Sequence, residues 1–226
     1  MPNQVPLVTP CMRATETIRV SSLMGEPSWR KAQPIKFVIP VTHQEPIGRT
    51  ECRLLWDDTC LYAGYRAWDK DIWSVYTEHD SRTCAEDCLE LFLQPEPGSE
   101  RYVNFEINAL GTVYDACCLR RKAGGESDHR WAAWNCDKLQ CHVGINGVIN
   151  RPDIEDTWWE LVLAIPFASL PIANGTPKPG DRWKFLASRY DYSIHLERGV
   201  ELSASAPLSA VRFHAPEEWT YLEFTR

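Results

Sequence analysis

The sequence predicts an all-β protein: a single-domain antiparallel β-sandwich over residues 1–226, with two sheets and roughly ten strands. The first observation behind this prediction is the alternation of apolar and polar residues in short runs, clearest at 102–108 (YVNFEIN). The second is that glycine and proline fall between such runs, as at Pro95, Gly98, Gly111 and Gly180. The third is that few segments show a helical period. Together these features favour short strands joined by turns.

Ten runs are expected to form strands, in chain order. In the run at 102–108, Val103, Phe105 and Ile107 would face one way and the polar residues the other, which is typical of a half-buried antiparallel strand. A single helical turn is expected at 166–170. The polar segment 122–135 carries Trp131 and Trp134, which would cap the sandwich or, as the less favoured alternative, offer a ligand platform. The ten runs are 17–20, 53–56, 60–67, 88–93, 102–108, 113–118, 139–145, 158–165, 182–190 and 221–224.

The composition excludes some classes of function. With 44% hydrophobic residues in 226, the chain can bury a substantial core. Its net charge is −7 and its basic residues are scattered, so nucleic acid is not expected as a partner. The longest apolar stretches, such as 161–170, are too short to span a membrane as a helix, which needs about 20 residues.

The cysteines and the N-terminal segment bear on location. Nine cysteines are an odd number, and mostly reduced thiols are favoured over a disulfide framework. The first residues lack a basic leader and a sustained apolar run, so no signal peptide is predicted. A cytoplasmic location is therefore favoured, with secretion after removal of a leader as the alternative. The spacings around Cys84 and Cys136 fit no common zinc site, and zinc is not predicted.

The segment 67–87 (AWDKDIWSVYTEHDSRTCAED) combines tryptophans and acids between two predicted strands, and a binding site is expected there because loops often carry function. Trp56, Trp159 and Trp183 lie inside strand patterns and are expected in the core. Asp69, Asp71 and Asp87 provide hard oxygen ligands that suit calcium. The equally weighted alternative is that these acids cap turns by accepting backbone N–H groups.

Five motifs in order resemble the family 9 carbohydrate-binding modules over most of the chain. The resemblance implies an antiparallel β-sandwich that binds sugars, often with structural calcium and usually appended to polysaccharide-degrading enzymes. The matching motifs are RLLWDDTCLYAGYRAWD (53–69), EDCLELFLQPE (86–96), YVNFEINALGTVYDA (102–116), WWELVLAIPFASL (158–170) and GDRWKFLASRYD (180–191).

The resemblance also implies candidate ligand-binding residues. Glu90 stands where the family places a sugar-binding carboxylate, and Trp73 is the best match for a stacking tryptophan, followed by Trp68. Glu106 replaces the arginine of ligand-binding modules, and the segment 203–210, where a second tryptophan is expected, has no aromatic residue. The candidate ligand-binding residues are Trp68, Trp73, Glu90, Glu106 and Arg189.

The resulting prediction is a stand-alone module that binds a mono- or oligosaccharide by aromatic stacking and carboxylate hydrogen bonds. No recognised catalytic signature is present, so an enzyme is not expected. Two alternatives stay open. One is a glycan-acting enzyme that uses Glu90 and Glu106, and the other is a structural or protein-binding sandwich that has lost the sugar site.

Overall fold

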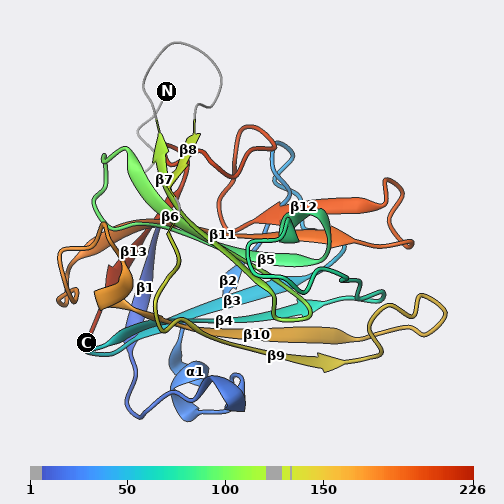
Figure 1. Ribbon diagram of the computed structural model, residues 1–226, viewed down its shortest axis with the longest axis horizontal. Helices are drawn as coiled ribbons and strands as arrows, with labels where there is room; N and C mark the ends of the chain where they lie inside the picture. Colours follow the sequence, from blue (N-terminus) through green and yellow to red (C-terminus); the bar gives the residue numbers. More distant parts are fainter. Residues whose placement is uncertain (1–6, 121–128, 133) are drawn as a thin grey trace.

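The computed structural model describes residues 7–120, 129–132 and 134–226 and shows two β-sheets packed face to face (Figure 1). We call the first layer sheet A; its strand order is β8-β7-β6-β5-β11-β13-β1, and β12 also pairs with β11. Its strands are β1 (Val8–Arg13), β5 (Cys88–Gln94), β6 (Arg101–Asn108), β7 (Val113–Arg120), β8 (His129–Ala132), β11 (Arg182–Tyr192), β12 (Val200–Ala204) and β13 (Thr220–Phe224).

The second layer, sheet B, has the order β1-β3-β4-β10-β9, with β2 beside β3. Its further strands are β2 (Ile35–Lys36), β3 (Thr50–Trp56), β4 (Cys60–Trp68), β9 (Gln140–Asn146) and β10 (Trp158–Pro166). The helical elements are short: η1 (Val20–Ser22), α1 (Pro27–Lys31), η2 (Thr83–Ala85) and η3 (Phe167–Ser169). None of the described helices is long and apolar enough to cross a membrane.

Strand β1 joins the two sheets. Its first part pairs with β13 in sheet A, from Val8 to Cys11, and its last two residues pair with β3 in sheet B. Both pairings are parallel, whereas the other strand pairs among the described residues are antiparallel. The sequence does not predict this strand, because Pro10 lies within it and proline argues against a strand in the middle of a sheet.

Alternate residues of both sheets fill the space between them. Leu91 and Phe105 of sheet A belong to the same buried cluster as Leu163 of sheet B. Trp56, Trp159 and Trp183 are buried in this cluster too, as predicted. Because such interiors are close-packed, truncating a residue like Leu91 to alanine should cost about 2–5 kcal/mol.

The outer faces of both sheets are also partly covered. On sheet A, residues such as Leu208, Phe213 and Trp219 of the segment after β12 pack on Phe92 and Tyr102. On sheet B, the segment around α1 packs Trp29 into one cluster with Leu55 and Val162, and Figure 1 shows α1 outside this sheet. Sheet A is thus covered by sheet B on one face and by the segment after β12 on the other, which explains why β5 and β6 are buried on both faces.

Nine of the ten predicted strands are confirmed, along with the helical turn after 166. The predicted strand at 17–20 is wrong, because Ile18 buries its side chain on the outer face of sheet B and η1 begins at Val20. The short strands β2, β8 and β12 were missed. Of the 122–135 segment, residues 122–128 and 133 and the side chain of Trp131 lie outside the described part of the structure. Trp134 packs edge-on against Phe105, as capping predicts.

Candidate functional site

Carboxylates anchor the loop between β4 and β5, which we call the 69–87 loop. Glu86 accepts a hydrogen bond from the backbone N–H of Val75 at 2.6 Å, and Asp87 accepts one from Trp73 at 2.6 Å. Asp69 accepts one from the N–H of Asp71, at 2.9 Å. Asp71 in turn accepts the N–H of Ile194, at 3.0 Å. The turn-capping alternative is therefore confirmed for Asp69, Asp71 and Asp87.

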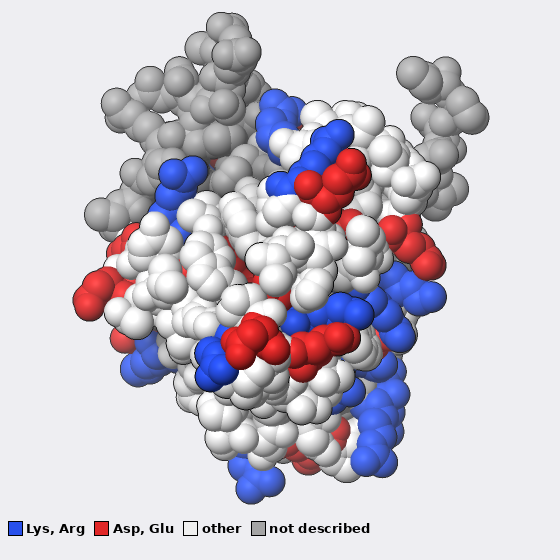
Figure 2. All heavy atoms as spheres, turned by 90° about the vertical axis from the view of Figure 1, so that its right-hand side faces the viewer, with Lys and Arg blue, Asp and Glu red and all other residues white. Residues whose placement is uncertain are grey.

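This loop lies at one end of the sandwich, with the loops that join β9 to β10 and β11 to β12 (Figure 1). Figure 2 shows this end: much of it is uncharged, and charged groups form a band across its middle. Exposed apolar side chains from several loops contribute to this surface, including Ile47, Trp73, Tyr76, Val148 and Ile194. A surface of this kind is typical of a ligand-binding region.

Trp73 is the tryptophan best placed to meet a ligand among the described side chains. It is 37% exposed and its ring lies 6.0 Å from that of Tyr192, at an angle of 60°. Tyr76 nearby is 38% exposed. Tyr192 was not predicted as a site residue, although the alternation of Tyr190 and Tyr192 along β11 could have indicated two rings on one face of sheet A.

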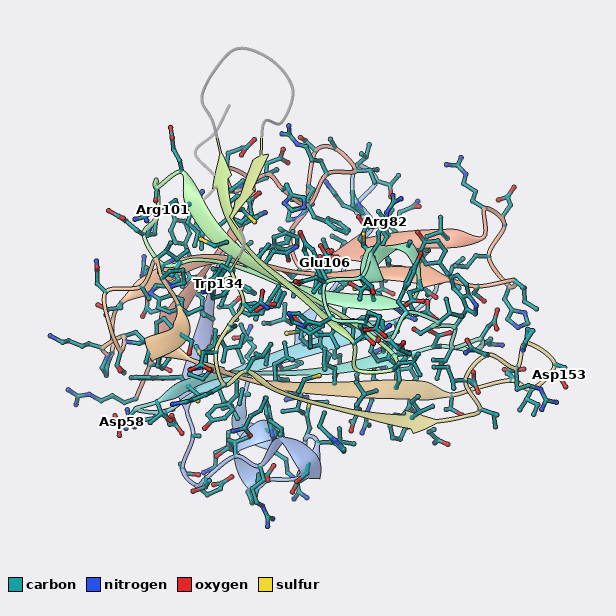
Figure 3. All side chains as sticks on the ribbon, in the orientation of Figure 1. Asp58, Arg82, Arg101, Glu106, Trp134 and Asp153 are labelled. Carbon is teal, nitrogen blue, oxygen red and sulfur yellow. The ribbon has the colours of Figure 1, made fainter. Side chains whose placement is uncertain are left out.

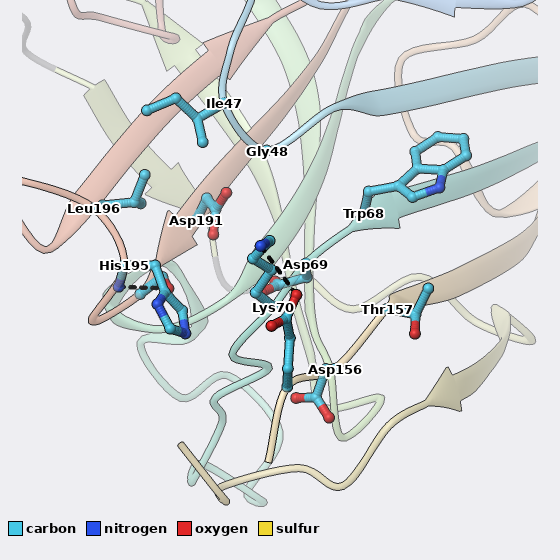
Figure 4. Close-up of a pocket in the computed structure, with 12 residues that line it drawn as sticks. Ile47, Gly48, Trp68, Asp69, Lys70, Asp156, Thr157, Asp191, His195 and Leu196 are labelled. Atoms are coloured by element: carbon cyan, nitrogen blue, oxygen red, sulfur yellow. Dashed lines mark hydrogen bonds and ion pairs between the residues drawn. The ribbon is translucent and has the colours of Figure 1, made fainter. Parts of the chain in front are cut away.

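Trp68 does not join Trp73 in a two-sided clamp. Its neighbours along β4 on the same face include Arg66, and the guanidinium of Arg49 covers its ring at 4.3 Å. In Figure 4 the indole of Trp68 points away from Asp69, Asp191 and His195. On sheet A, the segment 203–210 has no aromatic residue, and Ala206 and Leu208 are among the side chains that it packs on the outer face.

Glu90 and Glu106 lie directly opposite each other on β5 and β6, on the outer face of sheet A. Both are buried, at 2% and 6% exposed, which corrects the half-buried prediction for the 102–108 strand. Thr83 of η2 donates to Glu106 at 3.3 Å, and Ser188 donates to Glu90 at 2.6 Å. Figure 3 shows Glu106 near Arg82, which precedes η2. The pair is therefore covered by the end of the 69–87 loop.

The electrostatics of this carboxyl pair follow from its burial. One oxygen of each side chain lies within 4.8 Å of the other, and the pKa of Glu90 is raised well above its ordinary value by burial and by the charge of Glu106. Burial also raises the pKa of Glu106, against the hydrogen bonds that lower it. Ionising two neighbouring carboxyl groups at once has a high electrostatic free-energy cost, so the pair favours a shared proton.

Arg189 lies at the centre of a second acidic group, between the sheets. Its Nη2 is 2.7 Å from Asp69 Oδ2 and 3.3 Å from Asp191 Oδ2. Its Nη1 donates to backbone oxygens of Gly48 and Trp68. The side chain is 0% exposed, so Arg189 supports the loops from beneath and offers no atom to a ligand at the surface.

The predicted calcium ligands are only partly brought together. Asp69 and Asp87 converge with Asp191, because one oxygen of each lies within 4.8 Å of the others, whereas Asp71 is not in this cluster. Both oxygens of Asp87 already accept backbone N–H groups, from Trp73 and Tyr192. The Arg189 guanidinium supplies positive charge within the cluster. Calcium prefers six to eight oxygen ligands, and this donor set does not fit it.

These features define the class of the protein: a two-sheet β-sandwich whose aromatic and polar loops gather at one end. The chain belongs to carbohydrate-binding family 9, whose family model matches residues 31–224. A search among curated proteins finds no match.

Solved structures share the fold. A candidate carbohydrate-binding protein from Bacteroides uniformis superposes with a TM-score of 0.72 at 16% identity, covering 97% of this chain and 100% of that one. A family 9 module from Caldicellulosiruptor kristjanssonii in complex with cellotriose gives 0.63 at 10%, covering 97% and 94%. Its complex with glucose gives 0.63 at 11%, covering 97% of each chain. At these identities the similarity concerns the fold.

Proposed function

We propose that this protein is a carbohydrate-binding module that stacks a mono- or oligosaccharide on Trp73. The observation that carries the proposal is the exposed Trp73 ring beside Tyr192, in a chain of carbohydrate-binding family 9. Structures with the same fold bind cellotriose and glucose. An aromatic face buries the apolar side of a sugar, while polar groups around it bind the hydroxyls.

The buried carboxyl pair has a supporting role in this proposal. Glu90 and Glu106 are covered, and Glu106 accepts hydrogen bonds from Thr83 and Asn104 rather than facing an open cleft. We infer that the pair fixes the end of the 69–87 loop and so positions Trp73. Direct hydrogen bonds from these carboxylates to a sugar are therefore not part of the proposal.

The same geometry argues against the glycan-acting alternative. Retaining glycosidases hold two carboxyl groups about 5–5.5 Å apart across the scissile bond, and inverting enzymes hold them farther apart. Here one oxygen of each carboxyl group lies within 4.8 Å of the other and both groups are buried under the end of the 69–87 loop, which leaves no room for a glycosidic bond. Release of reducing sugar that disappears in Glu90→Gln would contradict this conclusion.

Calorimetric titration with glucose and cellotriose tests the proposal. Trp73→Ala should weaken binding at least several-fold, since stacking contributes roughly 1 kcal/mol. Trp68→Ala is the matched control, because it removes a ring of the same size that stacks on Arg49, and it should leave affinity unchanged. Absence of binding heat in the wild type would favour the protein-binding alternative. Loss of binding only in Trp68→Ala would move the site to sheet B.

A further inference from the structure

A cavity lies at the end of the sandwich where the 69–87 loop is found, and it is separate from the exposed Trp73 ring of the proposed sugar site. Its volume is about 300 Å³, the low end of the range for ligand pockets. Figure 4 shows it between the end of β4, the segment before β10 and the loop after β11. Its lining includes aliphatic side chains from Ile47 and Leu196 and the carboxylates of Asp69, Asp156 and Asp191.

Asp191 gives this pocket a negatively charged hydrogen-bond acceptor. The residue is only 5% exposed, yet its Oδ1 accepts no hydrogen bond from the described residues, and Oδ2 has Arg189 as its ion-pair partner at 3.3 Å. Burial raises the pKa of Asp191 to about 6, so the carboxylate is mostly ionised at pH 7. Asp191 lines the cavity, so an oxygen without a donor from the described residues is available to a hydrogen-bond donor of a ligand there.

The backbone at Gly48 is shaped around this carboxylate. A Cβ added to Gly48 would lie 1.9 Å from Asp191 Oδ2, so only glycine allows the acid to lie against the chain here. The N–H of Gly48 donates to Glu201 and its oxygen accepts from Arg189. Asp191 therefore lies against the backbone of Gly48 on one side and pairs with Arg189 on the other, as a preorganised site requires.

Most other charged side chains that line the pocket already have an ion-pair or hydrogen-bond partner within the protein. Lys70 pairs with Glu155 at 3.0 Å, and Asp156 accepts backbone N–H groups from Ile72 and Val148. The pocket has four carboxylates, against Lys70 at its rim and Arg189 beneath it. The net charge of these groups is therefore negative, and the apolar side chains of Ile47 and Leu196 form the walls of the pocket beside them.

We propose that this pocket binds a small ligand with an ammonium group on a partly apolar body, such as an amino sugar. The ammonium would donate to Asp191 Oδ1, and Ile47 and Leu196 would cover the body of the ligand. Ammonium–carboxylate hydrogen bonds are among the strong ones in a partly buried site. The proposal does not depend on the Trp73 site.

Titrations with glucosamine and N-acetylglucosamine at pH 7 and 0.15 M salt test it, because acetylation removes the charge and keeps the ring. The wild type should bind glucosamine several-fold more tightly than N-acetylglucosamine. Asp191→Asn should abolish this preference. Ile47→Lys should abolish it too, and the position is 79% exposed, so folding is not at risk. Val211→Lys adds the same charge at a 63% exposed position outside the pocket and should keep the preference.

Equal affinity of the wild type for both sugars would overturn the proposal, as would a preference that survives in both pocket variants. Loss of the preference in Val211→Lys would also overturn it, because the effect would then be the general attraction of an acidic protein for cations. Trp73→Ala should retain the amine preference even if it loses glucose, which separates this pocket from the proposed sugar site.

Discussion

Two groups of buried acids in this sandwich are stabilised in different ways. On the outer face of sheet A, Glu90 and Glu106 face each other with neutral donors around them. Between the sheets, Asp69 and Asp191 surround the guanidinium of Arg189. In the first group burial raises the pKa of both carboxyls, and in the second the charge of the acids is balanced by an arginine. The environment of an acid, more than its identity, therefore determines what it can bind.

Arg189→Met should show the largest effect. Removing the cation leaves buried carboxylates without a partner, which typically costs about 3–5 kcal/mol. Chemical denaturation should reveal this loss. Arg49→Met is the matched control, because Arg49 is a surface residue that pairs with Glu51 and should contribute about 1 kcal/mol or less. Equal losses in the two variants would show that the Asp69–Asp191 group does not depend on its arginine.

Glu106→Gln should have a smaller effect that depends on pH. Because burial raises the pKa of both carboxyls, the pair stabilises the fold below about pH 4.5, and this contribution is lost as pH rises through the raised values. Glutamine stays neutral, so the variant should melt at a higher temperature than the wild type at pH 8 and show no gain at pH 4.

Glu160→Gln serves as the contrasting control, because Glu160 is buried beside Arg66, whose Nε donates to it at 2.6 Å. This variant should lose stability at pH 8. If Glu106→Gln also melts earlier at pH 8, the shared-proton description of the sheet A pair is contradicted.

Chelation should have the smallest effect. We infer that Arg189 supplies the positive charge that calcium would bring, so EDTA should change the melting temperature by less than about 1 °C. A site saturated at 100 times its dissociation constant would stabilise the fold by roughly 2.7 kcal/mol, which thermal melting detects readily. A rise of several degrees on adding calcium would show that the Asp69–Asp191 group is a metal site after all.

The fold was more predictable from the sequence than the site. Alternation identified β6 and most other strands, because side chains of a strand point to opposite faces. It could not show that Glu106 lies under the 69–87 loop, since that cover comes from residues distant in the sequence. Strand β1 was concealed by Pro10, because proline argues against a central strand, and its sheet A partner β13 lies near the other end of the chain.

The candidate site was predicted in part. The acids and tryptophans of the 69–87 loop were recognised by type, and Trp73 is exposed as a platform requires. The partners of Arg189 and the pocket at Asp191 arise from contacts between separate loops, which residue spacing does not encode. Motifs identified the family, and only the arrangement in space distinguished supporting groups from accessible ones.

The position of β1 has a consequence for synthesis on the ribosome. The strand that joins the two sheets is made first, but it pairs with β13, and Thr225 donates to the carbonyl of Cys11 across a separation of 214 residues. A growing chain therefore carries Val8–Arg13 without its sheet A partner until residues 220–225 have emerged. Non-local closure of this kind slows folding and exposes strand edges to neighbouring chains. Shielding of the nascent chain should therefore raise the yield of folded protein.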